Sequence, residues 1–331
     1  MNKILTQEKQ VDDLTIRPKN IKEYIGQKKT IENLKIFIKS AKIRNEQLDH
    51  CLLYGPPGLG KTTLALIISN ELGTNIKYAS GPTIEKSKDL IANLTSLEKG
   101  DVLFIDEIHR IPKNLEEILY SAMEDYFIDI IIGNDNKARN IRIDLPPFTL
   151  VGATTRIGDL TGPLRDRFGI VSKLDYYTNE ELQQIIKRSA SVLNCKIDDK
   201  SVEDLSIRSR GTPRIANRLL KRIRDYAIVQ NNGIINTTLT NSSLKNLKVD
   251  KLGLDEIDLI ILKTIKNSFN GGPVGLKALA LSIGEEVSTI EDVYEPYLLQ
   301  IGFIKRTSRG RIITDNAINY LKIEWNLSFL V

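Results

Sequence analysis

Cysteine, histidine and tryptophan are scarce in this chain of 331 residues, which has two cysteines, two histidines and one tryptophan. Cys51 and Cys195 lie far apart and in no recognised spacing, so we expect neither a disulfide framework nor a cysteine-based zinc site. Neither His50 nor His109 has a second candidate ligand three or four residues further on, which argues against a histidine metal site. Aromatic residues make up only 6% of the chain, so its cores must be largely aliphatic.

Long apolar runs are absent as well. No stretch approaches the roughly 18 to 20 uncharged apolar residues that span a bilayer. The first residues, MNKILTQEKQVDDL, carry charge where a signal peptide needs its apolar core. We therefore expect a cytoplasmic protein that does not act at a membrane. The net charge of +5 permits nucleic-acid binding but does not by itself indicate it, because the position of the charge matters more.

The length and the pattern of the chain predict more than one domain. Residues 1–177 alternate short apolar runs with helical patterns, which predicts an α/β domain with a mostly parallel sheet covered by helices. Between the third and the fourth expected strand, residues 126–145 place two apolar segments around the polar turn GNDNKARN, which predicts an inserted hairpin. The expected strands of the sheet are residues 50–54, 76–79, 102–105, 148–152 and 170–174.

Helical patterns dominate the rest of the chain. Residues 178–248 are expected to form a small helical domain, which TNEEL opens with a capping residue and an acidic first turn. After a linker, residues 251–331 are expected to hold three helices and then a two-stranded wing, an order typical of a winged-helix domain. The three expected helices are residues 256–268, 276–283 and 288–299.

The strongest chemical signal is a P-loop, Gly55-x4-Gly60-Lys61-Thr62, between an apolar strand and a helix. In such a loop, backbone N–H groups and the helix N-terminus surround the phosphates. Lys61 is expected to reach the β- and γ-phosphate oxygens, and the Thr62 hydroxyl to bind Mg²⁺. The sequence therefore predicts ATP and Mg²⁺ as cofactors.

Two further expected strands end in polar residues. VLFIDEIHR places Asp106 and Glu107 at the end of a strand, where open α/β sheets bind ligands. Asp106 is expected to orient Mg²⁺, and Glu107 to polarise the attacking water. LVGATTR ends in Thr154 and Thr155, one of whose hydroxyls could reach the γ-phosphate, although threonine is common at strand ends.

GPPGLGKTT, DEIHR and VGATTR, in this order, resemble the AAA+ ATPases, and TGPLRDRFG and RGTPRIANRLL resemble their arginine-finger and second-sensor regions. IRPKNIKEYIGQ, the inserted hairpin, GGPVGL, EDVYEPYLLQIGF and RTSRGR are similar to the RuvB family of bacterial Holliday-junction motors, from about residue 16 to residue 311. The resemblance implies an AAA+ P-loop ATPase domain, a small helical lid and a C-terminal winged-helix DNA-binding domain. It also implies an ATP hydrolase that drives branch migration in DNA recombination, in repair and in the SOS response to DNA damage. Such a motor acts as a homohexameric ring on duplex arms.

The resemblance implies roles for individual residues. In the wing, Arg306, Arg309 and Arg311 are the implied DNA contacts, and Ser308 stands where the family has proline. Thr62 and Asp106 are the implied Mg²⁺ ligands. The implied catalytic residues are Lys61, Asp106, Glu107, Thr155 as the first sensor, Arg167 as the finger that enters the neighbouring subunit, with Arg165 as the alternative, and Arg214 as the second sensor. The implied nucleotide-binding residues are Ile16, Arg17, Tyr24, Ile25, Gly58, Gly60, Lys61, Thr62, Thr63, Glu124, Asp125, Tyr126, Arg167, Tyr177 and Arg214.

The implied partners are DNA, the junction-binding protein RuvA and the resolvase RuvC. RuvA would dock on the hairpin 126–145, where Ile130 and Ile141 are candidate contacts if they do not fold back onto their own domain. The basic residues of 206–224 are mostly expected on a solvated helix face. Arg214 differs from these residues, because the preceding Gly-Thr-Pro opens a helix and so fixes the Arg214 side chain at the helix start.

Two other functional classes stay open on the residues alone: a clamp loader or other protein remodeller, and a nucleotide-gated transcription regulator. A clamp loader would end in a helical collar. A regulator would place arginine, asparagine or glutamine in its recognition helix, whereas 288–299 is acidic. Residues 301–314 carry basic residues and no carboxylate, which favours contact with the phosphate backbone.

Overall fold

The computed structural model describes residues 16–132 and 139–328. The polar turn expected at the hairpin tip, residues 133–138, lies outside the described residues, as do residues 1–15 and 329–331. The chain forms two compact units, Met1–Tyr177 and Thr178–Val331. Among the described residues, no helix has both the length and the apolar character that crossing a membrane requires.

The first unit is built on a five-stranded sheet in the order β2-β3-β6-β1-β7. Every neighbouring pair is parallel, and Tyr54 of β1 lies opposite Thr154 of β6. The predicted α/β fold with a parallel sheet is confirmed, and the expected strands differ from the observed ones by one or two residues at their ends. The strands are β1 (Cys51–Tyr54), β2 (Ile76–Ser80), β3 (Val102–Asp106), β6 (Thr149–Thr154) and β7 (Ile170–Lys173).

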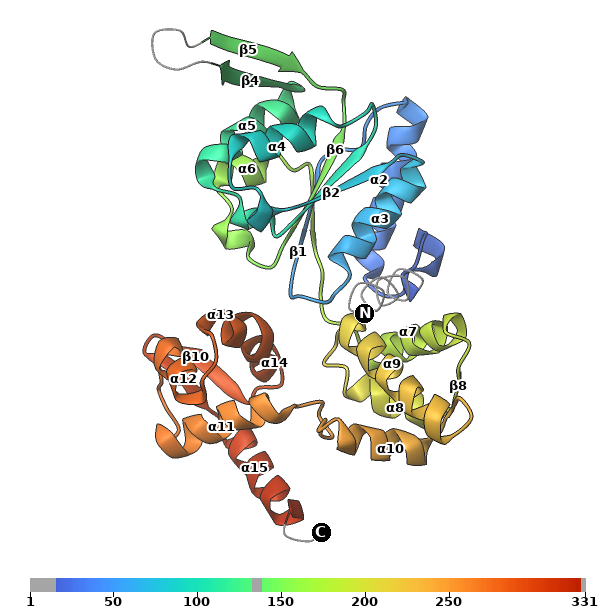
Figure 1. The fold of residues 1–331 in the computed structure, drawn as a ribbon, viewed down its shortest axis with the longest axis vertical. Coiled ribbons are helices and arrows are strands. Elements are labelled where there is room, and N and C mark those ends of the chain that lie inside the picture. The colour runs from blue at the N-terminus through green and yellow to red at the C-terminus, as the bar shows by residue number, and fades with distance from the viewer. Residues whose placement is uncertain (1–15, 133–138, 329–331) are drawn as a thin grey trace. The chain divides into compact units, whose positions relative to one another are not determined.

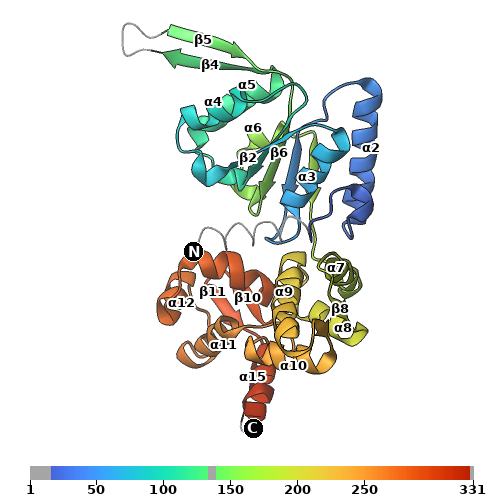
Figure 2. The same ribbon diagram turned by 45° about the vertical axis from the view of Figure 1, so that its right-hand side comes forward.

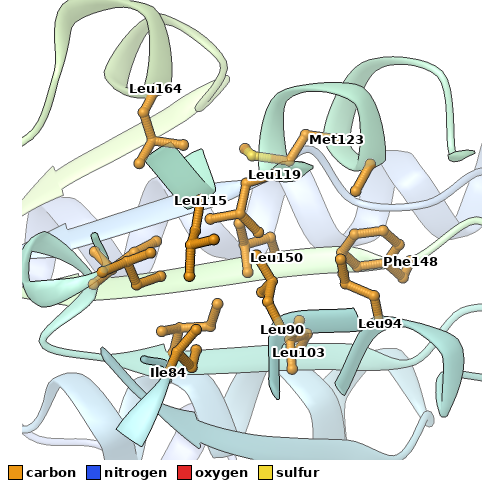
Figure 3. Packing of buried hydrophobic residues seen from close by; sticks show 14 of the residues in the cluster. Ile84, Leu90, Leu94, Leu103, Leu115, Leu119, Met123, Phe148, Leu150 and Leu164 are labelled. Carbon is orange, nitrogen blue, oxygen red and sulfur yellow. The ribbon is translucent and has the colours of Figure 1, made fainter. Parts of the chain in front are cut away.

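Helices cover both faces of this sheet (Figures 1 and 2). On one side lie α2 (Lys28–Arg44) and α3 (Lys61–Leu72), and on the other α4 (Ser87–Thr95), α5 (Lys113–Glu124) and α6 (Gly162–Asp166). The core between α4, α5 and the sheet is almost entirely aliphatic, as the low aromatic content predicts. Figure 3 shows Leu90 and Leu94 of α4 and Leu115 of α5 packing with Leu103, Leu150 and Phe148. The short turns are η1 (Ile21–Glu23), η2 (Gly81–Thr83), η3 (Ile108–Arg110) and η5 (Ile157–Asp159).

The predicted hairpin consists of β4 (Phe127–Ile132) and β5 (Arg139–Asp144). Figure 1 shows it projecting beyond α5, away from the loop between β1 and α3. Its base belongs to the core, because Ile128 is fully buried and Ile130 packs against the same cluster. Ile141, which pairs with Ile130, is 44% exposed. Of the two expected docking residues, Ile130 is therefore partly a core residue, and Ile141 is the one that faces solvent.

The second unit begins with four helices and a short parallel pair of strands. Thr178 caps the first helix, as TNEEL predicts, and it also forms a capping box with Glu181. The helices are α7 (Asn179–Val192), α8 (Asp199–Ile207), α9 (Pro213–Gln230) and α10 (Thr237–Asn246), and the strands are β8 (Lys196–Ile197) and β9 (Ile234–Ile235).

The third helix of the winged-helix part has the expected extent, because helical structure runs without a break over residues 287–300, but its middle is a π-helical turn. Pro296 cannot donate a backbone hydrogen bond, and a π-helical turn, η6 (Ile290–Tyr294), precedes it. A last helix, α15 (Asp315–Ser328), follows the wing and was not predicted. The other elements are α11 (Glu256–Ser268), α12 (Leu276–Ile283), α13 (Val287–Thr289), α14 (Glu295–Gln300), β10 (Ile304–Thr307) and β11 (Gly310–Ile313).

A buried arginine joins the two parts of the second unit. Arg210, expected on a solvated helix face, is only 7% exposed. Its guanidinium bonds Asp258 at 2.6 Å and Asp255 at 3.2 Å, and its Nε donates to the carbonyl oxygen of Gly253 at 2.7 Å. It also lies 5.1 Å from the centre of the Tyr297 ring. Burial raises the pKa of Asp258, and the charge of Arg210 opposes that rise.

Replacing Arg210 with methionine is expected to destabilise the protein by about 3–5 kcal/mol, because it leaves the buried Asp258 carboxylate without its partner. Denaturant unfolding monitored by circular dichroism measures the change. Arg222→Met is the matched control, since Arg222 and Asp225 form a pair that is about half exposed, and its effect should stay within about 0.5 kcal/mol. Equal effects of the two substitutions would contradict a structural role for Arg210.

Candidate nucleotide and DNA sites

The phosphate loop joins β1 to α3 and requires glycine at two positions. Gly55 has φ +145°, and a Cβ there would lie 2.4 Å from the carbonyl oxygen of Leu174. Gly60 has φ +99°, and a Cβ there would lie 3.1 Å from the Tyr24 hydroxyl oxygen. Thr62 and Thr63 follow in the first turn of the 12-residue helix α3, whose N-terminus favours negative charge.

Lys61 lies inside this loop. Its side chain is buried, and Nζ donates to the carbonyl oxygens of Gly55 at 2.8 Å and Pro56 at 3.0 Å. Burial lowers the pKa of Lys61, while the charges of Glu107 and Asp106 raise it. The ammonium group is thus held at the N-terminus of α3, where it would meet the β- and γ-phosphate oxygens of a nucleotide.

The ends of β3 and β6 bring the other two predicted signals together. The Glu107 carboxylate accepts hydrogen bonds from the Thr155 hydroxyl at 3.2 Å and from the Thr155 amide at 3.4 Å. His109 Nδ1 lies 3.2 Å from the same oxygen and 2.9 Å from the Thr154 hydroxyl. Burial lowers the pKa of His109, while the charge of Glu107 opposes that shift. The structure therefore places this histidine in the strand-end cluster that includes Glu107 and Thr155.

The backbone at Glu107 has the geometry of a sharp kink. Its φ is 47°, in the left-handed region, and its carbonyl oxygen would lie 2.2 Å from a Cβ on Gly81. The kink turns the Glu107 side chain toward Thr155, while Asp106 accepts a hydrogen bond from the Glu107 amide at 3.0 Å. The two neighbouring carboxylates therefore have different environments and can take different roles.

The residues present fit a magnesium ion that is completed by phosphate oxygens. No group of three or more histidine, cysteine, aspartate or glutamate side chains forms a metal cage in the part of the chain that the structure describes. Mg²⁺ in nucleotide sites is typically held by one or two protein oxygens together with the phosphates. Thr62, in the first turn of α3, and Asp106, at the end of β3, would supply such oxygens.

Two tyrosines pack beside the phosphate loop. The hydroxyl oxygens of Tyr24 and Tyr177 lie 2.8 Å apart, and the Tyr177 hydroxyl donates to the carbonyl oxygen of Leu59 at 3.2 Å. The segment that carries Tyr24 is tied to α3, because the Ile21 amide donates to Glu71 at 2.9 Å. In this segment Ile16 is buried and Arg17 and Ile25 are half-buried. Of these predicted residues, the two tyrosines are the ones whose contacts place them beside the phosphate loop.

Arg167 follows α6, and its described contacts are with α5 and α6. It bonds Glu124 at 2.8 Å, so this predicted nucleotide-binding carboxylate is directed at an arginine. Asp125 is exposed, and Tyr126 packs edge-on against Phe148. The alternative finger, Arg165, is exposed. In the second unit, Arg214 is exposed in the first turn of α9.

The wing depends on a carboxylate that sequence reasoning missed. Glu295 is 1% exposed, and its two oxygens accept four hydrogen bonds, at 2.8 to 3.2 Å, from Arg306 and Arg311. Burial alone would raise the pKa of Glu295, but these bonds hold it below its usual value. The Arg311 side chain is only 17% exposed, whereas that of Arg306 is 50% exposed and Arg309 lies exposed in the turn. The three predicted DNA contacts are therefore not equivalent.

The turn of the wing carries Ser308 and is closed by a threonine. The Thr307 hydroxyl donates to the carbonyl oxygen of Gly310 at 2.8 Å and accepts from the Arg309 amide at 3.3 Å. These bonds constrain the turn without proline.

Family models for RuvB match the chain over almost its whole length. The model described as "Holliday junction DNA helicase RuvB P-loop domain" matches residues 16–174, and the RuvB AAA lid domain matches residues 177–250. The RuvB C-terminal winged helix domain matches residues 251–322. The chain belongs to the RuvB family.

Relatives in the RuvB family share more than half of the residues. The Holliday junction branch migration complex subunit RuvB of Phytoplasma mali is 60% identical over 307 residues, which are 93% of this chain and 92% of that protein. The subunit of the same name from Limosilactobacillus reuteri is 58% identical over 319 residues, 96% of this chain and 94% of that protein. The structure titled as the Thermotoga maritima RuvB Holliday junction branch migration motor is 54% identical, with a TM-score of 0.85, and covers 93% of this chain and 98% of that one.

Membership of the RuvB family confirms the predicted AAA+ fold and the chemistry of the P-loop, which is nucleotide binding and ATP hydrolysis. The strand-end cluster is the part of the site that would act on the attacking water, because a glutamate carboxylate there can accept a proton.

Glu107→Gln is expected to retain nucleotide binding and to lower ATP turnover by about a hundredfold or more, because the amide cannot accept the proton of the water. Lys61→Ala should instead lose nucleotide affinity. Phosphate release and binding of a fluorescent nucleotide measure the two effects. Glu85→Gln, an exposed carboxylate of the same unit, is the control and should behave as the parent. Turnover at the parent rate in Glu107→Gln would remove this residue from the mechanism.

In the wing, Arg309→Ala is expected to weaken duplex binding equally for all DNA sequences, with no change in melting temperature. The slope of the logarithm of the binding constant against the logarithm of the salt concentration should become smaller in magnitude by about one. Arg311→Ala should also lower the melting temperature, because it removes a partner of buried Glu295. Fluorescence anisotropy at several salt concentrations measures binding, with Lys263→Ala on α11 as the basic-residue control. A loss limited to one DNA sequence would indicate base recognition.

Proposed function

We propose that this protein uses ATP hydrolysis to drive branch migration of Holliday junctions in DNA recombination and repair. The proposal rests on one observation: a complete P-loop site and a winged-helix part with an arginine-bearing wing occur in one chain that matches RuvB relatives over more than nine-tenths of its length. In the proposed division, residues 1–177 hydrolyse ATP, residues 178–248 form the lid and residues 251–331 bind DNA. We expect the protein to act in the cytoplasm, where it would serve the response to DNA damage.

The chain's own residues supply the steps of hydrolysis. Lys61 and the N-terminus of α3 hold the triphosphate, with Tyr24 and Tyr177 beside the loop. Mg²⁺, held by Thr62 and Asp106, would neutralise charge on the phosphate oxygens. Glu107, oriented by Thr155, accepts the proton of the attacking water.

Arg167 contacts α5 and α6 of its own subunit, and we propose that its guanidinium acts in the ATP site of the neighbouring subunit. The ATP site is then complete only when subunits assemble. Head-to-tail contacts form a ring when the rotation between subunits closes, and we propose a homohexamer of this kind. An arginine finger contributes about 10³- to 10⁵-fold to phosphoryl transfer. Arg214 at the start of α9 is the proposed second sensor.

The hairpin is the proposed docking site for RuvA. On one face, Asp129 and Arg142 form a bidentate pair at 3.0 and 3.1 Å, and the Arg142 guanidinium lies 3.8 Å from the centre of the Phe127 ring. The charged groups of this face therefore pair with each other. The other face is apolar: it starts in the core at Ile128 and reaches solvent at Ile141. An apolar surface that continues beyond its own core favours a small partner interface. RuvC is the proposed resolvase in the same assembly.

Branch migration of a synthetic four-way junction, with and without RuvA, tests the function. We expect ATP-dependent dissociation of the junction that RuvA stimulates, and ATP turnover that a junction raises more than linear duplex does. Loading of a protein clamp, or binding to a single DNA sequence, would favour the alternative classes.

Ile141→Ser is expected to lower RuvA-stimulated branch migration by about tenfold while basal ATP hydrolysis and melting temperature stay near those of the parent. Ile43→Ser is the control, because Ile43 lies on α2 and is 75% exposed. Full RuvA stimulation in Ile141→Ser would contradict docking through this side chain, and a large loss of stability would show that it belongs to the core.

A further inference from the structure

One face of α5 carries Glu116, Tyr120 and Glu124 at four-residue spacing. This spacing aligns side chains along one face of a helix. The apolar stripe beside it packs into the core and so fixes the rotation of α5, which fixes the direction of the three polar residues as well. Figure 3 shows members of this apolar stripe, Leu115, Leu119 and Met123.

The first two residues of the polar stripe hold the start of α6. Glu116 is 1% exposed, and its Oε2 accepts hydrogen bonds from the Tyr120 hydroxyl at 3.0 Å and from the Thr161 hydroxyl. The Tyr120 hydroxyl oxygen also lies 2.9 Å from the Thr161 hydroxyl oxygen. Thr161 is the N-cap of α6 and accepts from the Leu164 amide at 3.4 Å. A buried carboxylate with these bonds fixes the position of the helix.

The other end of α6 carries Arg167, which lies over the same tyrosine. The guanidinium carbon is 4.5 Å from the centre of the Tyr120 ring, a cation–π distance. Nη1 donates to the carbonyl oxygen of Pro163 at 2.8 Å, and Nη2 bonds Glu124 at 2.8 Å. Tyr120 therefore contacts both ends of the element: its hydroxyl meets the cap, and its ring supports the guanidinium.

The guanidinium is held here without full satisfaction of its donors. Arg167 Nε is buried and has no hydrogen-bond partner. The partner of Nη2, Glu124, has a side chain that is 58% exposed, and ion pairs so exposed contribute little. An unpaired buried donor is costly, so an arrangement that satisfies Nε would be preferred. A triphosphate, which carries more negative charge than one carboxylate, can replace Glu124 as the partner of Nη2.

We propose that Tyr120, held in place by Glu116, is the positioning residue of the arginine finger: its hydroxyl sets α6, and its ring presents the Arg167 guanidinium for transfer from Glu124 to the phosphates of the neighbouring subunit. The proposal rests on the assignment of Arg167 as that finger. Tyr120 itself touches no reacting atom and acts through Arg167.

The test compares Tyr120→Leu, Tyr120→Phe and Glu116→Gln with Arg167→Ala. Tyr120→Leu should lower ATP turnover at saturating ATP by about tenfold to a hundredfold, because a misplaced catalytic group lowers the rate by a factor of this order. The affinity for a fluorescent nucleotide should stay within about twofold, because the P-loop is untouched. Tyr120→Phe keeps the ring and should lose less, as should Glu116→Gln. Glu117→Gln, the exposed neighbour on the same helix, is the matched control and should keep the parent rate.

Mixed rings separate positioning of the finger from general damage. A Lys61→Ala subunit has a defective phosphate loop but an intact finger, so mixing it with Tyr120→Leu should restore turnover in the neighbouring Tyr120→Leu site. Turnover at the parent rate in Tyr120→Leu, or a loss that mixing does not restore in rings shown to co-assemble, would overturn the proposal. If Arg167→Ala itself turns over ATP normally, the assignment of the finger fails, and this proposal fails with it. If Arg167→Ala is inactive while Tyr120→Leu is not, only the role of Tyr120 fails.

Discussion

The position of β6 between β1 and β3 is the constraint on which the ATPase site depends. The strands are parallel, so their carboxyl ends meet at one edge of the sheet. That edge brings Lys61, after β1, to the same region as Glu107, after β3, and Thr155, after β6. The phosphate loop, the carboxylates and Thr155 come from segments separated by tens of residues, and the strand order alone makes them neighbours.

Buried carboxylates organise arginines in every part of the molecule. Asp258 holds Arg210 at the junction of the helical and winged-helix parts, and Glu295 holds Arg306 and Arg311 in the wing. In the first unit, Glu116 acts indirectly, through Tyr120. In each case a charge that would be costly to bury alone is compensated by hydrogen bonds. Arg309 and Arg214 remain exposed, and they are the arginines proposed to contact DNA and nucleotide.

The hairpin shows how one element can serve two purposes. Ile128 anchors its base in the core, and the same apolar face continues outward to Ile141. The core therefore fixes the base of the strand pair that carries the exposed Ile141. The element also follows α5 directly, and α5 carries the residues that contact Arg167. A partner bound to the hairpin would therefore lie next to α5, the helix that contacts the proposed finger.

The sequence by itself determined the features that depend on near neighbours in the chain. The P-loop, the strand that ends in Asp106, the helix cap at Thr178 and the hairpin follow from apolar periodicity, glycine spacing and local hydrogen bonding, so each was predicted within a few residues. Only the tertiary structure decided the buried pairings. Arg210 and Asp258 are 48 residues apart, and their contact turned an expected surface residue into a buried one. Glu295 and Arg311 likewise meet only because the third helix of the winged-helix part lies against the wing. A charged residue in a sequence carries no mark of whether it will be solvated or paired, because that depends on the desolvation and the partner that folding supplies.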